Sequence, residues 1–155
     1  MIRILLGLWL ILSLYGCLDP KAEDVVRDWR PLGQNGPTLG AAVTASPLAK
    51  GQTWETYAGE AGATTVRVSV EYNATAAAGT CPTPAKDLRP AARIFLLLDF
   101  TVASNRSVTP VSARAQVYTA KGYYEDYPLD LTVMADLMAK VFPLPCTDLV
   151  LPDYL

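Results

Sequence analysis

Histidine is missing from this chain of 155 residues. Without an imidazole, the chain cannot form the Ser-His-Asp or Cys-His arrangements of nucleophilic catalysis. It also lacks the commonest general base near neutral pH and the commonest transition-metal ligand. No Ser-x-x-Lys sequence and no nucleophile-elbow pattern takes the place of these groups. We therefore expect no enzymatic activity, no catalytic residue, no metal site and no cofactor.

An excess of basic residues is also missing. The chain has 13 Lys and Arg against 15 Asp and Glu, which gives a formal net charge of −2. Nucleic-acid binding needs clustered cations that neutralise phosphates, and attraction to anionic lipid head groups has the same requirement. The sequence contains no such cluster, so we expect no nucleic-acid partner.

Long apolar runs are scarce, and the clearest one stands at the start of the chain. It covers the 13 residues from Ile4 to Gly16 and follows the basic Arg3. As a helix this run would span about 20 Å, which is short of the roughly 30 Å of a bilayer's hydrocarbon core. A basic start followed by a short apolar run is typical of a secretory signal peptide.

The apolar run ends in Leu14-Tyr15-Gly16-Cys17, which resembles the lipobox of bacterial lipoproteins. The resemblance implies that residues 1–16 are removed and that Cys17 becomes the first residue, diacylated on its sulfur. Proteins of this class carry two or three acyl chains, whereas a single chain gives only marginal membrane binding. Leu18 replaces the aspartate that favours inner-membrane retention, so the resemblance implies the periplasmic face of the outer membrane. An ordinary cleaved signal with a chance cysteine and a short uncleaved anchor remain alternatives.

Cysteine is equally scarce, and only Cys81 and Cys146 remain after Cys17. In an oxidising periplasm two such cysteines usually pair. They lie 65 positions apart (146 − 81), and closing a loop of that length would stabilise the fold by about 4 kcal/mol. Two separate buried thiols are the alternative. We expect the disulfide.

The segment after Cys17 carries charges among a few apolar residues. It predicts a short helix from Pro20 to Trp29, with Asp19 as its N-cap and Pro31 as its stop. Residues 31–51 are rich in Gly, Pro and Ala and form either a linker or an irregular stretch packed on the domain. We therefore expect three parts: a signal peptide at 1–16, a lipid-anchored helix and linker at 17–51, and a single globular domain at 52–155.

The globular part contains four segments with the alternation of β-strands, and these are residues 52–58, 64–72, 92–104 and 111–118. Gly59 to Gly62 predicts a turn that joins the first two segments into a hairpin. The third segment is apolar on both faces, which is typical of a central strand. A stripe of apolar residues at steps of three and four predicts a helix over 131–142. The fold class expected is α+β, with about four antiparallel strands and the C-terminal helix packed on one face.

Two features after residue 92 are candidate sites. Asp99 lies in an otherwise apolar strand, so it is either a buried functional carboxylate or an ion-pair partner of Arg93 and Arg114. Tyrosine is enriched at protein interfaces, and the short segment 118–127 contains four tyrosines. The tyrosines that we expect to form a partner surface, with core packing as the alternative, are Tyr118, Tyr123, Tyr124 and Tyr127.

These observations favour a non-catalytic envelope lipoprotein, which acts as an adaptor or accessory subunit of a periplasmic or outer-membrane assembly. Its expected partners are the membrane, through the lipid on Cys17, and a protein of the cell envelope. The alternative is a periplasmic module that binds a lipid, a glycan or a peptide in a groove between sheet and helix. An enzyme is the third hypothesis.

Overall fold

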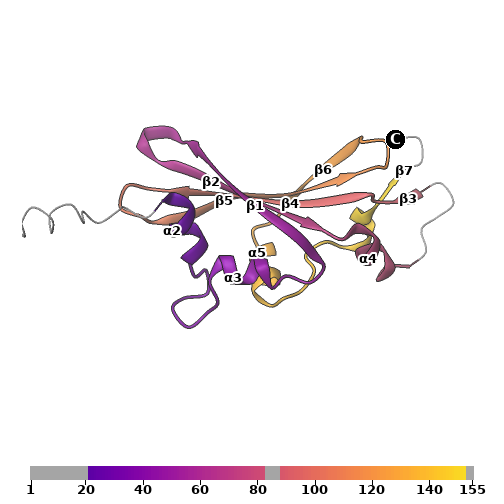
Figure 1. Cartoon of the computed structure of the whole chain (residues 1–155), viewed down its shortest axis with the longest axis horizontal. Helices are drawn as coiled ribbons and strands as arrows, with labels where there is room; N and C mark the ends of the chain where they lie inside the picture. Colours follow the sequence, from indigo (N-terminus) through magenta and orange to yellow (C-terminus); the bar gives the residue numbers. More distant parts are fainter. Residues whose placement is uncertain (1–20, 83–87, 153–155) are drawn as a thin grey trace, which may run out of the picture.

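A computed structural model describes residues 21–82 and 88–152, and its centre is a five-stranded antiparallel sheet (Figure 1). The strands stand in the order β1-β2-β4-β5-β6. Their bounds are β1 (Ala49–Ala58), β2 (Thr64–Tyr72), β4 (Arg93–Val102), β5 (Val108–Tyr118) and β6 (Tyr124–Leu129). The α+β class and the antiparallel sheet predicted from the sequence are therefore confirmed.

Strict alternation of apolar and polar residues explains the central strands. In β2, Val66, Val68 and Val70 are fully buried, while the residues between them are partly exposed. The structure gives β2 the bounds predicted for it, and the turn at 59–62 joins it to β1 as expected, through the short helix η1 (Glu60–Gly62). In β4, Leu97 is only 8% exposed although it lies on the opposite face to Leu96 and Leu98, which explains why this strand has two apolar faces.

The predicted count of about four strands is wrong, because the main sheet has five. The missed strand is β6, whose sequence Tyr-Glu-Asp-Tyr-Pro-Leu has two acids and a proline. It pairs with β5 alone, from Ala113 opposite Leu129 to Tyr118 opposite Tyr124. An edge strand tolerates a proline and exposed charges, so its sequence lacks the alternation that marks a half-buried strand.

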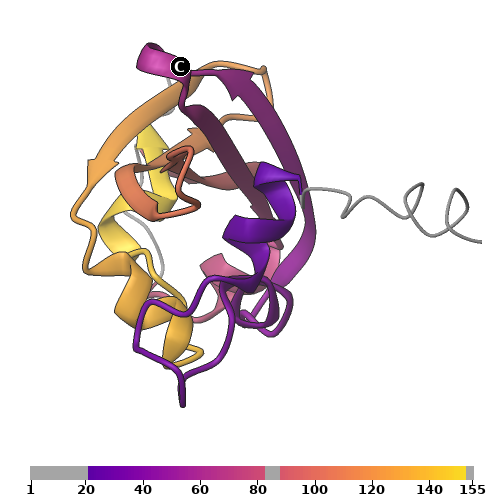
Figure 2. The same cartoon turned by 90° about the vertical axis from the view of Figure 1, so that its left-hand side faces the viewer.

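Short helices lie on one side of the sheet. They are α2 (Ala22–Asp28), α3 (Leu39–Thr44) and α5 (Val133–Met138), and Figure 1 shows them below the strands. Figure 2, a view along the sheet, shows α2 inside the curve of the strands. The hydrophobic core lies between these helices and the face of the sheet that is turned toward them. Among the described residues, no helix is both long and apolar enough to span a membrane.

Helices α2 and α3 belong to the folded domain. Val26 of α2 and Leu39 of α3 are fully buried in the same core as the strands, and Val43 is 1% exposed. The two helices approach closely at Gly40, where a Cβ atom would lie 2.6 Å from Cγ of Arg27. Of the two interpretations of residues 31–51, a linker is therefore wrong for residues 39–44, and packing on the domain describes them.

Helix α5 is shorter than the helix predicted over 131–142. It begins two residues later, and the Asp130 carboxylate accepts a hydrogen bond from the Thr132 amide just before it. It ends before Lys140, whose φ of 57° is left-handed and incompatible with a continuing helix. Four of its six residues (Val133, Met134, Leu137 and Met138) are buried in the core.

Cys81 and Cys146 are joined at one end of the molecule, with their sulfur atoms 2.08 Å apart and their Cα atoms 5.5 Å apart. The bond connects the end of helix α4 (Ala74–Gly79) to the short helix η2 (Cys146–Leu149). Next to it, β3 (Leu88–Pro90) and β7 (Val150–Pro152) pair as a separate two-stranded ribbon. The predicted disulfide is thus present, and it ties the C-terminal segment to the connection between β2 and β4.

The place of α3 in the core can be tested with one leucine pair. We expect Leu39→Ala to lower the free energy of unfolding by about 2–5 kcal/mol, because it leaves a cavity in a fully buried site. Leu32→Ala is the matched control: Leu32 is 63% exposed in the loop before α3, so its loss should cost less than about 0.5 kcal/mol. Urea unfolding of both variants measures the difference, and equal values would place α3 outside the core.

Candidate functional site

The face of the sheet that the helices leave uncovered carries Asp99 and two of the candidate tyrosines, Tyr118 and Tyr124. Strand register aligns their side chains in rows across the strands: Arg67 lies opposite Asp99, and Asp99 lies opposite Ser112. A second group lies toward the other end of the same face, where Arg93 is opposite Tyr118 and Tyr118 is opposite Tyr124.

Asp99 is held by two partners from neighbouring strands. Arg67 donates from Nε to Oδ1 over 2.7 Å and from Nη2 to Oδ2 over 3.1 Å, and the Ser112 hydroxyl donates to Oδ2 over 2.9 Å. Burial raises the pKa of Asp99. The hydrogen bonds from Arg67 and Ser112 and the charges of Arg67 and Arg114 outweigh that effect, so the pKa of Asp99 lies below its ordinary value. The carboxylate is therefore ionised at neutral pH and serves a structural ion pair.

Asp99 does form an ion pair, as one of the two interpretations predicted, but its partner is Arg67 and neither Arg93 nor Arg114. Arg93 pairs with Glu71 instead, with Nε 3.3 Å from Oε1. Arg114 pairs with Asp126 on β6, with Nη1 3.7 Å from Oδ2, and acts on Asp99 only through its charge. The sequence analysis considered only Arg93 and Arg114 as partners of Asp99, whereas the register of β2 against β4 places Arg67 opposite it.

Three aromatic rings from neighbouring strands form a continuous cluster on the same face. Phe95 of β4 meets Tyr118 of β5 edge-on, with ring centroids 5.6 Å apart, and Tyr118 stacks on Tyr124 of β6 at 5.0 Å. The guanidinium of Arg93 lies over the Phe95 ring, 4.7 Å from its centroid. We call Phe95, Tyr118 and Tyr124 the aromatic cluster.

The structure brings only part of the predicted tyrosine surface together. Tyr118 and Tyr124 belong to the aromatic cluster, whereas Tyr123 lies in the β5–β6 turn, where its carbonyl accepts a hydrogen bond from the Thr119 amide and it is 60% exposed. Tyr127 is opposite Ala115, on the helix-covered face, and is partly buried against the core. Its assignment to a partner surface is therefore wrong, because residues 124 and 127 of one strand point to opposite faces.

Phe95 is a member of the aromatic cluster that the sequence analysis did not select. Its position in the alternation of β4 puts it on the same face as Asp99, which was visible in the sequence. Its neighbour in space, Tyr118, comes from the register between β4 and β5, which was not.

Polar side chains border the aromatic cluster and bind one another. The Tyr118 hydroxyl donates to Oε1 of Gln116 over 3.2 Å, and Nε2 of Gln116 donates to Oδ2 of Asp126 over 3.4 Å. Asp126 in turn pairs with Arg114. The exposed rings are thus surrounded by groups whose charges and hydrogen bonds are largely matched within the face.

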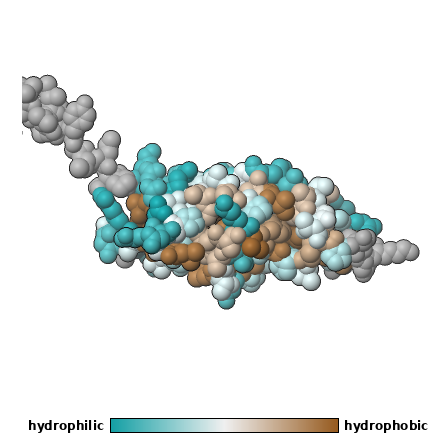
Figure 3. Space-filling model, turned by 90° about the horizontal axis from the view of Figure 1, so that it is seen from below, coloured by the Kyte–Doolittle hydropathy of each residue, from teal (hydrophilic) through white to brown (hydrophobic). Residues whose placement is uncertain are grey.

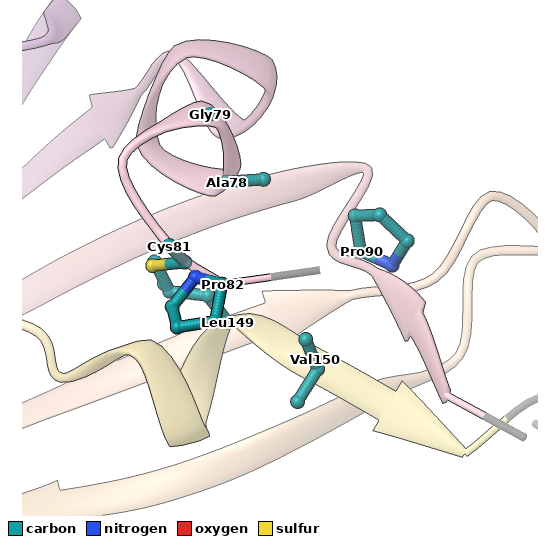
Figure 4. A pocket seen from close by; sticks show the side chains of 7 residues that line it. All are labelled: Ala78, Gly79, Cys81, Pro82, Pro90, Leu149 and Val150. Carbon is teal, nitrogen blue, oxygen red and sulfur yellow. The ribbon is translucent and has the colours of Figure 1, made fainter. Parts of the chain in front are cut away.

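Two cavities lie beside the β3–β7 ribbon, and a third lies at the start of α2. One of about 360 Å³ is lined by residues of that ribbon and of the β5–β6 turn, including Arg89, Lys121 and Leu151. Another of about 270 Å³ lies between α4 and the ribbon, with Cys81, Pro90 and Val150 on its walls (Figure 4). A third, of about 280 Å³, lies between α2 and the ends of β2 and β4.

Other features leave parts of the sequence analysis untested. Cys17 lies outside the described residues, so its lipidation stays a prediction. Within residues 21–82 and 88–152, no three or more Cys, Asp or Glu side chains are grouped so that they could hold a metal ion.

The chain matches no family model, and no curated protein and no solved structure is significantly similar to it.

The Asp99 ion pair predicts a particular pH dependence of stability. At pH 7, we expect Asp99→Asn to lower the free energy of unfolding by about 1–2 kcal/mol, since the pair is only partly buried. The folded-state pKa is below the ordinary value of 3.8, so this contribution is complete above that pH and is lost as the pH falls through the folded pKa. Urea unfolding from pH 7 to pH 2 should show the two proteins converging only below about pH 4.

Asp126→Asn provides the control for this prediction. Its pair with Arg114 is 3.7 Å long and its side chain is 36% exposed, so its loss should cost less than about 0.5 kcal/mol at any pH. A difference between wild type and Asp99→Asn that is unchanged down to pH 2 would contradict the assignment.

Proposed function

We propose that this chain is an envelope lipoprotein, anchored through Cys17, that acts as a non-catalytic adaptor and binds a partner protein through the aromatic cluster and Tyr123. The observation that carries the proposal is the aromatic cluster on an uncovered sheet face, together with a further exposed tyrosine, Tyr123, in the turn that leads into β6. Tyr124 is 52% exposed and Tyr123 is 60% exposed, although both are large and partly apolar.

Ring packing supports the use of this surface as an interface. The stacking of Tyr124 on Tyr118, and the edge contact of Tyr118 with Phe95, restrict the rings before a partner arrives. Side chains that are already ordered lose less conformational entropy on binding. Tyrosine also combines a large contact area with a polar tip, and it is frequent among the residues that dominate binding energy.

The charges of the face favour a protein over a polyanion. The arginines of the uncovered face each have an acidic partner on a neighbouring strand: Arg67 with Asp99, Arg93 with Glu71, and Arg114 with Asp126. A surface whose cations are already paired offers little attraction to phosphates. The expected partner surface is therefore apolar or aromatic at its centre, with a polar rim that matches the border of the cluster.

The anchor rests on the sequence of residues 14–17 and on the disulfide. The lipobox resemblance supports diacylation of Cys17, and the structure's pairing of Cys81 with Cys146 agrees with an oxidising compartment. We propose the periplasmic face of the outer membrane as the location, because Leu18 follows the cysteine.

A ligand-binding module is the second candidate, and the cavity of about 360 Å³ favours it. Its walls combine the apolar Leu151 and Pro152 with the basic Lys121, a combination that suits a small amphiphilic anion. This cavity lies beside the ribbon and not in the sheet–helix groove that the sequence analysis expected for a ligand. We place this function second because the cavity is lined only by the short β3–β7 ribbon and the β5–β6 turn.

Alanine substitutions at the exposed tyrosines test the proposed interface. We expect Tyr123→Ala and Tyr124→Ala each to reduce crosslinked recovery of a specific envelope protein from native membranes by about tenfold, as the loss of a central interface tyrosine does. Because both side chains are exposed, thermal unfolding of the variants should stay close to that of wild type.

Tyr57→Ala is the matched control for this experiment. Tyr57 is 44% exposed on the same face, but it lies on β1 near the opposite end of the sheet. Recovery of the partner should be unchanged in this variant. Equal recovery in all three variants would contradict the interface, and loss in all three would assign binding to the face as a whole.

A further inference from the structure

Helix α2 begins very soon after the proposed anchor. Cys17 and Ala22, the first residue of α2, are five residues apart, and a fully extended chain of that length reaches about 18 Å. Whatever conformation the intervening residues adopt, the start of α2 cannot lie farther than this from an acylated Cys17. This tether, residues 17–22, is thus shorter than the length of the sheet, because the ten residues of β4 alone span about 30 Å.

Helix α2 cannot move away from the domain to lengthen the tether. Val26 is fully buried, and the Trp29 ring meets the Phe100 ring of β4 edge-on with centroids 5.6 Å apart. The Arg27 guanidinium of the same helix lies 4.5 Å from the centroid of the Trp54 ring of β1. Detaching α2 would expose these groups to water. The α2 end of the domain therefore stays within the length of the tether, about 18 Å, of an acylated Cys17.

The start of α2 lies at one particular end of the sheet. Ala22 and Val25 share a cavity with Gly62 at the β1–β2 turn and with Val102 and Ser104 at the β4–β5 turn. The aromatic cluster lies at the other end of the same strands, because β4 runs from Arg93, opposite Tyr118, to Val102, opposite Val108. Ten residues of β4 span about 30 Å. Figure 1 shows the same arrangement, with α2 and β6 toward opposite ends.

We infer that the end of the domain formed by α2, the β1–β2 turn and the β4–β5 turn lies against the lipid head groups, so that the aromatic cluster faces away from the bilayer. This inference rests on the proposed acylation of Cys17. It identifies the bilayer surface as the partner of the α2 end and requires the protein partner of the aromatic cluster to reach within about 50 Å of the bilayer.

The surface at the α2 end suits contact with head groups without insertion. Its exposed side chains are polar and of mixed charge, and they include Lys21, Asp24, Glu60 and Ser104. Figure 3 shows hydrophilic residues gathered at this end of the molecule. Orientation therefore comes from the short tether, since an apolar insertion or a basic patch would be needed for independent membrane binding.

Energy transfer from the two ends of the sheet to the membrane tests the orientation. The protein from residue 17 onward would be coupled through the Cys17 thiol to a maleimide lipid in phosphatidylcholine vesicles, while the disulfide protects the other two cysteines. A donor is placed at Ser104 or at Lys121, both exposed turn residues at opposite ends of β5, and the acceptor is a head-group-labelled lipid. We expect transfer from position 104 to be at least about twice as efficient as from position 121.

A flexible insertion supplies the control. Twenty Gly and Ser residues placed between Pro20 and Lys21 have a root-mean-square span of about 25 Å and release the domain from the tether's limit, so the two efficiencies should become similar. Equal efficiencies without the insertion would overturn the inference, and so would a difference that survives it. Because the lipid is attached chemically, these outcomes are independent of whether the cell acylates Cys17.

Discussion

Covering one face of the sheet with α2 and α3 determines which side of each strand every second side chain must take. The valines of β2 and the leucines of β4 enter the core, so the residues between them have to form the opposite surface. On that surface, opposite charges pair across neighbouring strands, as Arg67 does with Asp99. The rings of the aromatic cluster lie on the same surface. The site and the core are thus two consequences of one alternation.

Residues with strong alternation could be placed from the sequence, and residues with pairing-dependent roles could not. Thr64–Tyr72 was predicted with its observed bounds because four large apolar side chains recur at every second position. β6 was missed because Glu125, Asp126 and Pro128 mask any alternation, and it is a strand only through its pairing with β5. Helix α3 was missed because Leu-Gly-Ala-Ala-Val-Thr is too short for a periodic signal, and burial of Leu39 and Val43 stabilises it.

The candidate site likewise contains residues that could be predicted from the sequence and partners that could not. Asp99 and the tyrosine-rich segment were visible as unusual residues, and the disulfide followed from the number of cysteines. The partners of these residues depend on strand register, which no single segment encodes: Arg67 for Asp99, and Phe95 for Tyr118. Tyr127 shows the converse error, since grouping residues by sequence proximity ignored that it points into the helix-covered side of the sheet.

The central claim is a disulfide-bonded domain held at a membrane by a lipid on Cys17. Its most direct test is the intact mass of the protein extracted from its native membrane without reductant. The account predicts the mass of residues 17–155 plus two or three acyl chains, less the two hydrogens removed by the Cys81–Cys146 bond. A chain without acyl groups, cut at another position or retaining residues 1–16, would contradict it.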